Sequence, residues 1–432
     1  MPDEILIAAL SPTGHIGPLL TVAQDLVLRG DRVTVMTGDQ HADGIRAIGA
    51  IPHRLPAVAD LDPSAGRDGT HARSSKIAAL NRGVTRMFLA PMPYQFAAVR
   101  AAITETTFDA IIADFGFFGV LPLLLGDRRA RPPVLLYTPT PLMLSSRDTA
   151  PNGLGLPPGT GWRARVRNRV LNIVTHRVLL RPTQRVANAL LRECGARRLP
   201  VFLFDVGRLA DRYVVPTVPD FEYPRKDLPA NVRFVGAVHP QPCTGWVPPT
   251  WWTTLRADRP VVHVTQGTVD NEDLSRLIEP AIAALADEDV TVVVTTGGRD
   301  VREVRGPIPA NTIVCEYLPH DVLLPKVDVM VTNGGYGAVQ RAVSAGVPLV
   351  VAGATEDKPE VAARVAWSGA GVDLRTGTPT AAMVRHAVRK VLGDHRYLAR
   401  ARALEAAFAQ RDGVAEIAAL VDEVIAERAA VC

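Results

Sequence analysis

The sequence predicts an α/β protein built from two Rossmann-like domains. The chain has 432 residues, 47% of them hydrophobic, so it can bury a large core and exceeds the size of one ordinary domain. Short runs of β-branched residues alternate with helical patterns, as in parallel sheets covered by helices. The alternation stops at a stretch rich in Pro, Gly and Trp and then restarts. We therefore expect domains at 1–239 and 257–411, a linker at 240–256 and a final helix at 412–432.

The first half opens with a strand, a turn and a helix. Residues 5–10 suit a buried strand, SPTGHIG forms the turn after it, and a helical pattern then runs to Gly30, which predicts a C-cap there. Ligands of such sheets gather at the carboxyl ends of strands, where this turn lies. Its His15 could cap a helix or bind a loop carbonyl, or it could act as a base with a pKa near 6.5.

A second polar residue follows another strand of the same half. Asp114 ends the apolar run at 110–113, on the same edge of the predicted sheet as His15. One interpretation is a cap for the helical pattern that follows. The other is a partner that orients His15 and stabilises the imidazolium formed on proton transfer.

The composition argues against several classes of protein. A net charge of +4 suits a small anionic substrate but is too weak to indicate nucleic-acid binding. The four cysteines are far apart with no C-x-x-C pair, which favours a reducing cytoplasm. No signal peptide is visible, and no apolar run approaches the roughly 18 residues of a membrane span. We also find no D-x-D element and no cluster at metal-ligand spacing, so we expect no metal.

Two further stretches of the first half predict a loop and a long helix. Residues 56–93 read as a long polar loop followed by a helix, and the part without periodicity is LDPSAGRDGTHARSS at 61–75. Loops of this length often form binding loops or lids. Residues 162–191 form a long helical pattern with seven arginines, which Pro182 interrupts. The alternative for this pattern is a basic amphipathic helix that meets anionic membrane lipid. With the arginines in solvent, the residues expected to face the core are Val166, Val170, Ile173, Val174 and Val178.

The second half contains a glycine-rich turn between a buried strand and a helix. VDVMVT leads into Asn333-Gly334-Gly335-Tyr336-Gly337, and a further strand, VPLVVAG, follows and ends before Glu356-Asp357. Glycines let a backbone approach a phosphate, and the free N–H groups at a helix start favour an anion. The turn is therefore a candidate pyrophosphate seat. Similar turns also occur in sheets without a ligand and in NAD sites with an acidic residue about 20 positions on.

The stretch at 313–361, which contains this turn, resembles the donor-binding signature of the UDP-glycosyltransferase superfamily with the GT-B fold, particularly its bacterial natural-product enzymes. In the first half, Gly14-His15-Ile16-Gly17-Pro18 resembles the catalytic segment of that family. The resemblance covers nearly the whole chain. It implies two domains facing each other across a cleft and a last helix that crosses back to the first domain. The matching pieces of the second half are Tyr317-Leu318-Pro319-His320, Asn333-Gly334-Gly335-Tyr336-Gly337-Ala338, residues 342–350 and Asp357-Lys358.

The resemblance also implies a reaction and a set of site residues. His15 would be the general base and Asp114 its partner in a metal-independent, inverting transfer from a UDP- or TDP-sugar, with no further cofactor. The acceptor would be a hydroxyl of a small lipophilic molecule such as a polyketide, macrolide or flavonoid. The implied donor contacts are Gly14, Gln266, Gly267, Thr268, Tyr317, Leu318, His320, Asn333, Gly335, Gly337, Ala338, Asp357 and Lys358. The implied acceptor pocket contains Phe115, Phe117, Phe118, Thr138 and Thr140.

Several donor positions depart from the family pattern. Asn333 replaces a diphosphate-binding histidine, Ala338 a Ser or Thr, and Lys358 a glutamine, whereas Arg341 stands where many members have a ribose-binding glutamate. These changes leave the base and the sugar open. Two alternatives remain: a glycosyltransferase for a lipid acceptor at the membrane face, and a catalytically silent nucleotide-sugar-binding protein. An NAD-dependent dehydrogenase fits less well, because it gives His15 and Asp114 no role and the G-x-G-x-x-G spacing is absent.

Overall fold

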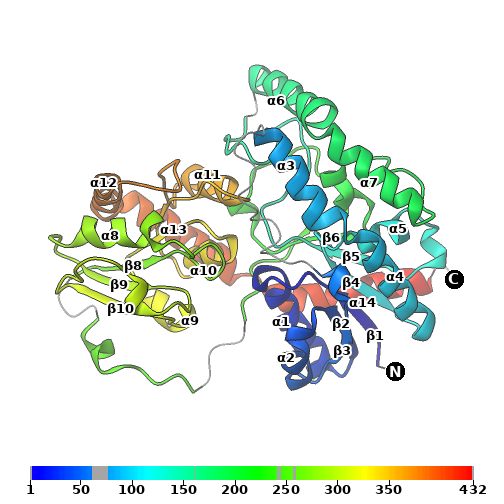
Figure 1. Ribbon diagram of the computed structural model, residues 1–432, viewed down its shortest axis with the longest axis horizontal. Helices are drawn as coiled ribbons and strands as arrows, with labels where there is room; N and C mark the ends of the chain where they lie inside the picture. The colour runs from blue at the N-terminus through cyan, green and yellow to red at the C-terminus, as the bar shows by residue number, and fades with distance from the viewer. Residues whose placement is uncertain (1, 61–75, 160, 241–244, 256–258, 431–432) are drawn as a thin grey trace.

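The computed structural model describes residues 2–60, 76–159, 161–240, 245–255 and 259–430. The polar loop expected at 61–75 and part of the linker expected at 240–256 lie outside these residues. The described chain forms two separate parallel sheets with helices packed on their faces (Figure 1). This arrangement confirms the predicted fold class of two Rossmann-like domains.

The first sheet contains seven strands and the second contains six, all parallel to their neighbours. In spatial order, the first is β3 (Ile51–Arg54), β2 (Arg32–Thr37), β1 (Glu4–Ala8), β4 (Ala110–Asp114), β5 (Val134–Tyr137), β6 (Arg212–Val215) and β7 (Val232–Phe234). The second is β10 (Thr312–Cys315), β9 (Thr291–Thr295), β8 (Val261–Thr265), β11 (Val329–Thr332), β12 (Leu349–Val351) and β13 (Gly371–Asp373).

The helices lie on both faces of each sheet. Those of the first half are α1 (Thr13–Arg29), α2 (Ala42–Ala47), α3 (Lys76–Val84), α4 (Met92–Glu105), α5 (Leu121–Leu124), α6 (Trp162–Val174) and α7 (Arg181–Glu193). Those of the second half are α8 (Ile278–Leu285), α9 (His320–Leu323), α10 (Tyr336–Ser344), α11 (Lys358–Ser368), α12 (Ala381–Gly393), α13 (His395–Ala409) and α14 (Gly413–Ala429).

Each sheet is buried on both faces because successive side chains of a strand point to opposite sides. In β1, Ile5 and Ile7 pack in the cluster that includes α1. Leu6 and Ala8 pack in the opposite cluster, which includes α4. The helix α1 ends as the sequence predicts, since Gly30 adopts the left-handed conformation with φ 102° and its N–H binds the last turn.

The last helix, α14, packs on the first sheet and not on the second. Ile417 and Val421 are fully buried in the cluster of α1 and β1. At the rim, Arg212 of β6 contacts Glu423 and Glu427. The chain therefore begins and ends on the same half of the molecule (Figure 1). The expected residue limits of the domains and the linker, at 239, 256 and 411, stay a prediction.

The orientation predicted for the arginine-rich helical stretch is wrong. The pattern forms α6, a π-helical turn at Thr175–Leu179 and then α7, which begins beside Pro182. The inward face of α6 is polar, because Asn168 and Asn172 donate hydrogen bonds to backbone carbonyls of residues 146–149. The apolar residues expected in the core are exposed instead: Val166, Val170, Ile173, Val174 and Val178.

Candidate active site

The first part of the site lies at the carboxyl ends of β1 and β4. These strands are neighbours and pair in parallel, so the turn after β1 and the last residue of β4 meet at one edge of the sheet. His15, in the first turn of α1, places its Nδ1 2.8 Å from Oδ2 of Asp114. Asp114 is fully buried, whereas the side chain of His15 is 23% exposed. The structure thus joins two residues 99 positions apart and does not use Asp114 as a helix cap.

The surroundings of His15 set its protonation. Burial lowers the pKa of His15, but the charge and hydrogen bond of Asp114 oppose this, so the pKa lies above its ordinary value of 6.5. In the neutral ring, Nδ1–H donates to Asp114, which leaves the lone pair of Nε2 to accept a proton. This is the tautomer that a general base requires.

The second part of the site is the glycine-rich turn between β11 and α10. Asn333 donates through Nδ2 to the carbonyl of Gln266, which directly follows β8, and its Oδ1 accepts from the N–H of Gly335, 3.4 Å away. Gly334 has φ 86°, and a Cβ there would lie 2.8 Å from Cγ1 of Val351. Only glycine meets this geometry without strain. Asn333 therefore ties the turn together, and its amide is already engaged.

The start of α10 is open. The first bond of this helix runs from the N–H of Val339 to the carbonyl of Gly335, so the N–H groups of Gly337 and Ala338 precede the helical ladder. A Cβ on Gly337 would meet no atom within 4 Å, so there is space beside the backbone. Gly267 lies in the turn after the neighbouring strand β8 and has φ 75°. The residue after it, Thr268, is exposed. These groups surround a helix N-terminus suited to an anion.

A cluster of ring side chains and one cation lies beside this turn. Tyr317 is 61% exposed, whereas Leu318 is buried. The ring of His320 packs edge-on against His263 with centroids 5.4 Å apart. Burial, with His263 and Arg341 nearby, lowers the pKa of His320 to about 3, and it stays neutral at working pH. Burial also lowers the pKa of Arg341, partly offset by Tyr317 and Asp321.

The acidic pair after β12 brings the two halves of the site together. Burial raises the pKa of the half-buried Asp357, and the charges of Asp357 and His15 act on each other across the domains. Lys358, which is buried, contacts Glu356 and lies 3.4 Å from Oδ2 of Asp270. The ammonium group of Lys358 is therefore paired within the protein.

The five acceptor-pocket candidates follow the ends of β4 and β5, at the edge of the first sheet where Asp114 contacts His15. Phe115, Phe117 and Phe118 are at most 6% exposed and belong to the core cluster on the α4 face. Thr138 is buried and donates its hydroxyl to the carbonyl of Thr140, which is half-buried. These residues form packed structure behind the site, and their contact with an acceptor stays a prediction.

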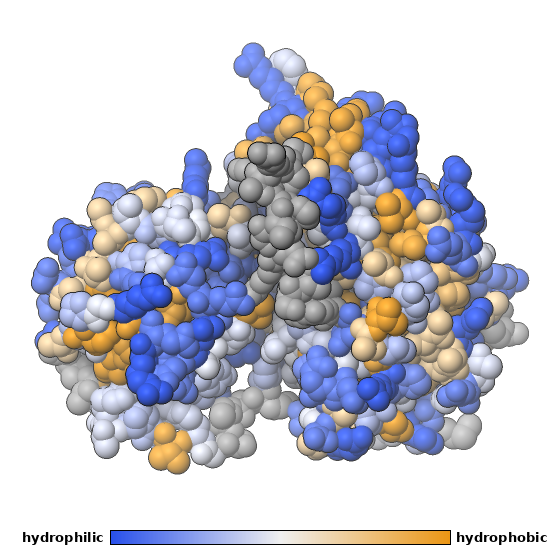
Figure 2. Space-filling model, in the orientation of Figure 1, coloured by the Kyte–Doolittle hydropathy of each residue, from blue (hydrophilic) through white to orange (hydrophobic). Residues whose placement is uncertain are grey.

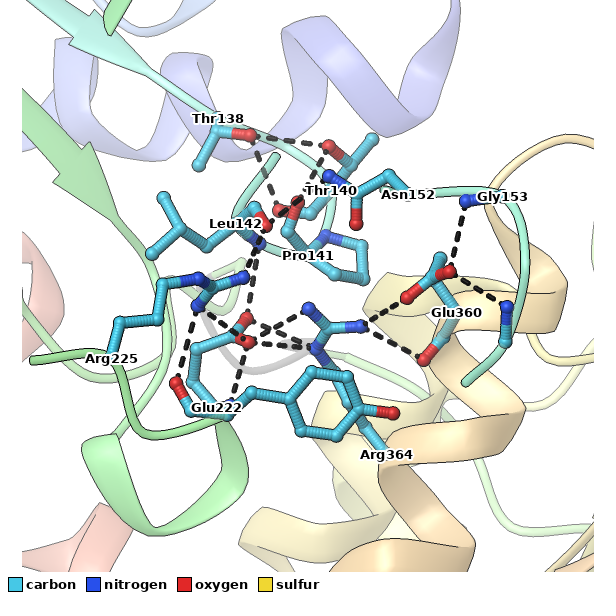
Figure 3. Close-up of polar contacts among 12 residues, drawn as sticks. Thr138, Thr140, Pro141, Leu142, Asn152, Gly153, Glu222, Arg225, Glu360 and Arg364 are labelled. Carbon is cyan, nitrogen blue, oxygen red and sulfur yellow. Dashed lines mark hydrogen bonds and ion pairs between the residues drawn. The ribbon is translucent and has the colours of Figure 1, made fainter. Parts of the chain in front are cut away.

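A buried network of charges connects the domains next to the site (Figure 3). Arg364 of α11 is fully buried and donates to both oxygens of Glu222, at 2.7 to 3.1 Å. It also binds Oε2 of Glu360 at 3.0 Å. Burial alone would raise the pKa of Glu222, but Arg364 and Arg225 hold it below its usual range. The carboxylate therefore stays ionised inside the protein.

The same network holds the loop that follows β5. Oε1 of Glu360 accepts from the N–H groups of Gly153 and Gly155, at 2.9 and 2.8 Å. Glu222 accepts from the N–H of Leu142, at 3.0 Å. Because α11 begins directly after Asp357, this loop and the acidic pair are fixed relative to each other. Sequence reasoning missed these residues, since no local pattern marks partners so far apart in the chain.

Two kinds of feature are absent from the part of the chain that the structure describes. None of the helices is both long and apolar enough to cross a membrane. Within the same residues, no group of three or more His, Cys, Asp or Glu side chains is placed to hold a metal ion.

Comparison with known proteins identifies the family. Residues 279–424 match the family model of the erythromycin biosynthesis protein CIII-like C-terminal domain. The chain is 42% identical over 429 residues to 4'-demethylrebeccamycin synthase of Lentzea aerocolonigenes, covering 98% of this chain and 100% of the relative. It is 35% identical to UDP-glycosyltransferase 2 of Phaeomoniella chlamydospora, covering 98% and 96%.

A solved structure agrees with the fold. The glycotransferase of kitacinnamycin superposes with a TM-score of 0.76 at 22% identity, covering 98% of this chain and 100% of that one. The two relatives and this structure each cover 98% of the chain. The chain therefore belongs to the UDP-glycosyltransferase superfamily, has its GT-B architecture, and is a glycosyltransferase.

Proposed function

We propose that this glycosyltransferase moves a sugar, with inversion and without a metal, from a UDP- or TDP-sugar to a hydroxyl of a small lipophilic acceptor. The observation that carries the proposal is the pair of His15 and Asp114, with Nδ1 and Oδ2 2.8 Å apart and Asp357 of the other domain close enough to influence the charge of His15. A protein that only binds a nucleotide sugar has no use for an oriented base. The pair therefore favours catalysis over the silent alternative.

The proposed reaction is a single displacement in which a proton passes from the acceptor to His15. Nε2 of His15 takes the proton of the acceptor hydroxyl as the hydroxyl oxygen attacks the anomeric carbon. The bond between that carbon and the diphosphate breaks on the opposite face, and the diphosphate leaves with the electron pair. Asp114 holds the ring in the productive tautomer and stabilises the imidazolium. A single displacement of this kind inverts the anomeric centre.

The donor binds on the second domain in this proposal. The diphosphate lies at the start of α10, where Gly337 and Ala338 present N–H groups and Gly337 leaves open space. These fixed donors offset the charge that develops on the leaving group. The exposed ring of Tyr317 stacks on the base, and Asp357 binds sugar hydroxyls.

The relatives support the nature of both substrates. One relative with near-complete coverage is a rebeccamycin synthase and another is named a UDP-glycosyltransferase. We infer that the acceptor is a natural product similar in size to the one in the first relative's name. We also infer that the reaction takes place in the cytoplasm.

The test combines binding with transfer. Thermal unfolding with UDP, TDP, GDP, ADP and NADH shows which ligand stabilises the native state, because a ligand that binds only that state raises the midpoint. We expect a shift with UDP or TDP, and a hexose mass increment on a hydroxylated polycyclic acceptor when the matching nucleotide sugar is supplied. A shift without transfer to any acceptor of a broad panel would favour the silent alternative. No shift with any diphosphate would remove the donor site.

A further inference from the structure

The helix α6 and the π-helical turn after it present an apolar face to solvent. Six side chains are 38% to 72% exposed: Trp162, Val166, Val170, Ile173, Val174 and Val178. Their spacing of three and four residues places them on one stripe about 25 Å long, from the rise of about 1.5 Å per helical residue. The space-filling view shows apolar surface at the top of the molecule, where α6 lies, with hydrophilic surface beside it (Figures 1 and 2).

The opposite face of α6 explains why this stripe cannot turn inward. Asn168 and Asn172 bind carbonyls of residues 146–149, and Nε2 of His176 lies 3.0 Å from the hydroxyl of Ser145. Arg165 pairs with the buried Asp148 at 3.1 Å. Rotating the helix would leave these buried polar groups without hydrogen-bond partners, which would cost free energy. The outward direction of the apolar stripe is therefore fixed by the fold.

The charge of this surface has one sign. No Asp or Glu occurs between positions 162 and 192, whereas eight arginines do. Apart from Arg165, seven of them are exposed: Arg163, Arg167, Arg169, Arg177, Arg181, Arg185 and Arg192. A face that combines an apolar stripe, flanking arginines and a terminal Trp has the composition of helices that lie at the interface of an anionic bilayer.

The neighbouring helix extends the surface. Asn81 of α3 donates to the carbonyl of Leu179 at 2.8 Å, and its Oδ1 accepts from the hydroxyl of Thr183, so α3 lies beside the junction of α6 and α7. On α3, Ile77 and Leu80 are 44% and 54% exposed. Two further exposed apolar side chains thus lie on the helix beside that junction.

We propose that the surface formed by α6, its π-helical turn and the exposed side of α3 docks on an anionic lipid bilayer. A second copy of the chain fits this surface poorly, because pairing two such faces would bring their arginines together. This proposal rests on the proposed function, in which the acceptor is a small lipophilic molecule. Because α6 and its π-helical turn bind residues 145–149 of the loop after β5 through the opposite face, docking holds that loop one helix diameter, about 10 Å, from the lipid in which lipophilic acceptors concentrate.

The test is co-sedimentation of the full chain with vesicles of phosphatidylglycerol and phosphatidylcholine, compared with vesicles of phosphatidylcholine alone. We expect binding to the anionic vesicles that weakens as salt is raised, because salt screens exposed charges. The apolar variant V170S/V174S/V178S and the charge variant R163Q/R169Q/R177Q should each lower the vesicle partition by about tenfold or more.

Matched controls carry the same substitutions elsewhere on the surface. The variants L28S/V58S/L398S and R46Q/R302Q/R396Q change exposed side chains away from α6 and should bind vesicles as the unaltered chain does. The thermal shift with nucleotide should persist in all four variants, which separates a lost docking surface from a misfolded protein and from a failed donor site. Absent binding to anionic vesicles would overturn the proposal, and so would apolar and charge variants that bind these vesicles as strongly as the unaltered chain does. So would a dimer, seen by analytical ultracentrifugation, that V170S/V174S/V178S dissociates.

Discussion

Arg364 and Glu222 form an ion pair 2.7 Å long in which neither side chain is more than 1% exposed, although 142 residues separate them in the chain. The guanidinium lies on α11 of the second domain, and the carboxylate directly follows a short helical turn at Pro219–Phe221 of the first domain. Glu360 and Arg225 complete the network on either side. The contact between the domains thus depends on charges that water does not reach.

Replacing Arg364 with Met should destabilise the protein by about 3–5 kcal/mol, because it leaves Glu222 and Glu360 buried with less compensating charge. Urea unfolding followed by tryptophan fluorescence measures this change. The control is Arg402→Met, which removes an exposed guanidinium paired with Glu405 and should change the unfolding free energy little. Equal unfolding midpoints for the two variants would contradict the role given to the network.

Replacing His15 with Ala should lower kcat on the order of 10²–10⁴-fold, the range typical for loss of a general base. The thermal shift produced by the donor nucleotide should remain, because His15 is absent from the proposed diphosphate seat. Full activity in the variant would remove His15 from the mechanism, whereas loss of the nucleotide shift would show that the substitution disturbs the donor domain.

The acid side of the pH–rate profile should reflect His15. The base works only when neutral, and the pKa of His15 is raised, so activity should fall as the pH drops through a value above 6.5. In the variant Asp114→Asn the carboxylate no longer opposes burial, and this acid limb should move to lower pH while kcat also falls. An unchanged limb position in that variant would mean that another group controls the profile.

Replacing Gly337 with Asp should affect stability and donor binding in opposite directions. An acidic side chain in the first turn of α10 favours the helix by about 0.3–1 kcal/mol, so the free protein should become more stable. The same charge repels a diphosphate, so the affinity for UDP or TDP should fall, as calorimetric titration can measure. The variant Gly337→Ala separates the two effects, since it adds helix propensity without charge. Undiminished affinity in Gly337→Asp would place the diphosphate elsewhere.

The strands and the glycine-rich turn could be predicted because local sequence controls them. Buried strands of a parallel sheet are short runs of β-branched residues, and Gly334 marks a backbone that a side chain cannot follow. The meeting of His15 and Asp114 required one further step, the rule that strand ends in such sheets share an edge. The 2.8 Å contact agrees with that expectation, whereas its catalytic role stays a proposal.

The orientation of α6 could not be predicted from the same principles. Periodicity shows which residues share a face, but it does not show which face the rest of the protein covers. Here Asn168 and Asn172 face inward because the loop they cover presents carbonyl groups. The partners of Glu222 were equally hidden, because pairing across domains leaves no local pattern in one sequence.

The bonds from Glu360 to Gly153 and Gly155 bear on the engineering of hybrid enzymes. Exchanging the first 239 residues for those of a relative is an attractive way to change the acceptor while keeping the donor. The incoming half must then supply a carboxylate at the position of Glu222 and two amides that reach Glu360. A hybrid that lacks them would leave the buried Arg364 and Glu360 with only each other as partners, and it would lose the contact that fixes the loop after β5 against Asp357. Choosing parents by these few positions is therefore a better guide to a working hybrid than overall identity.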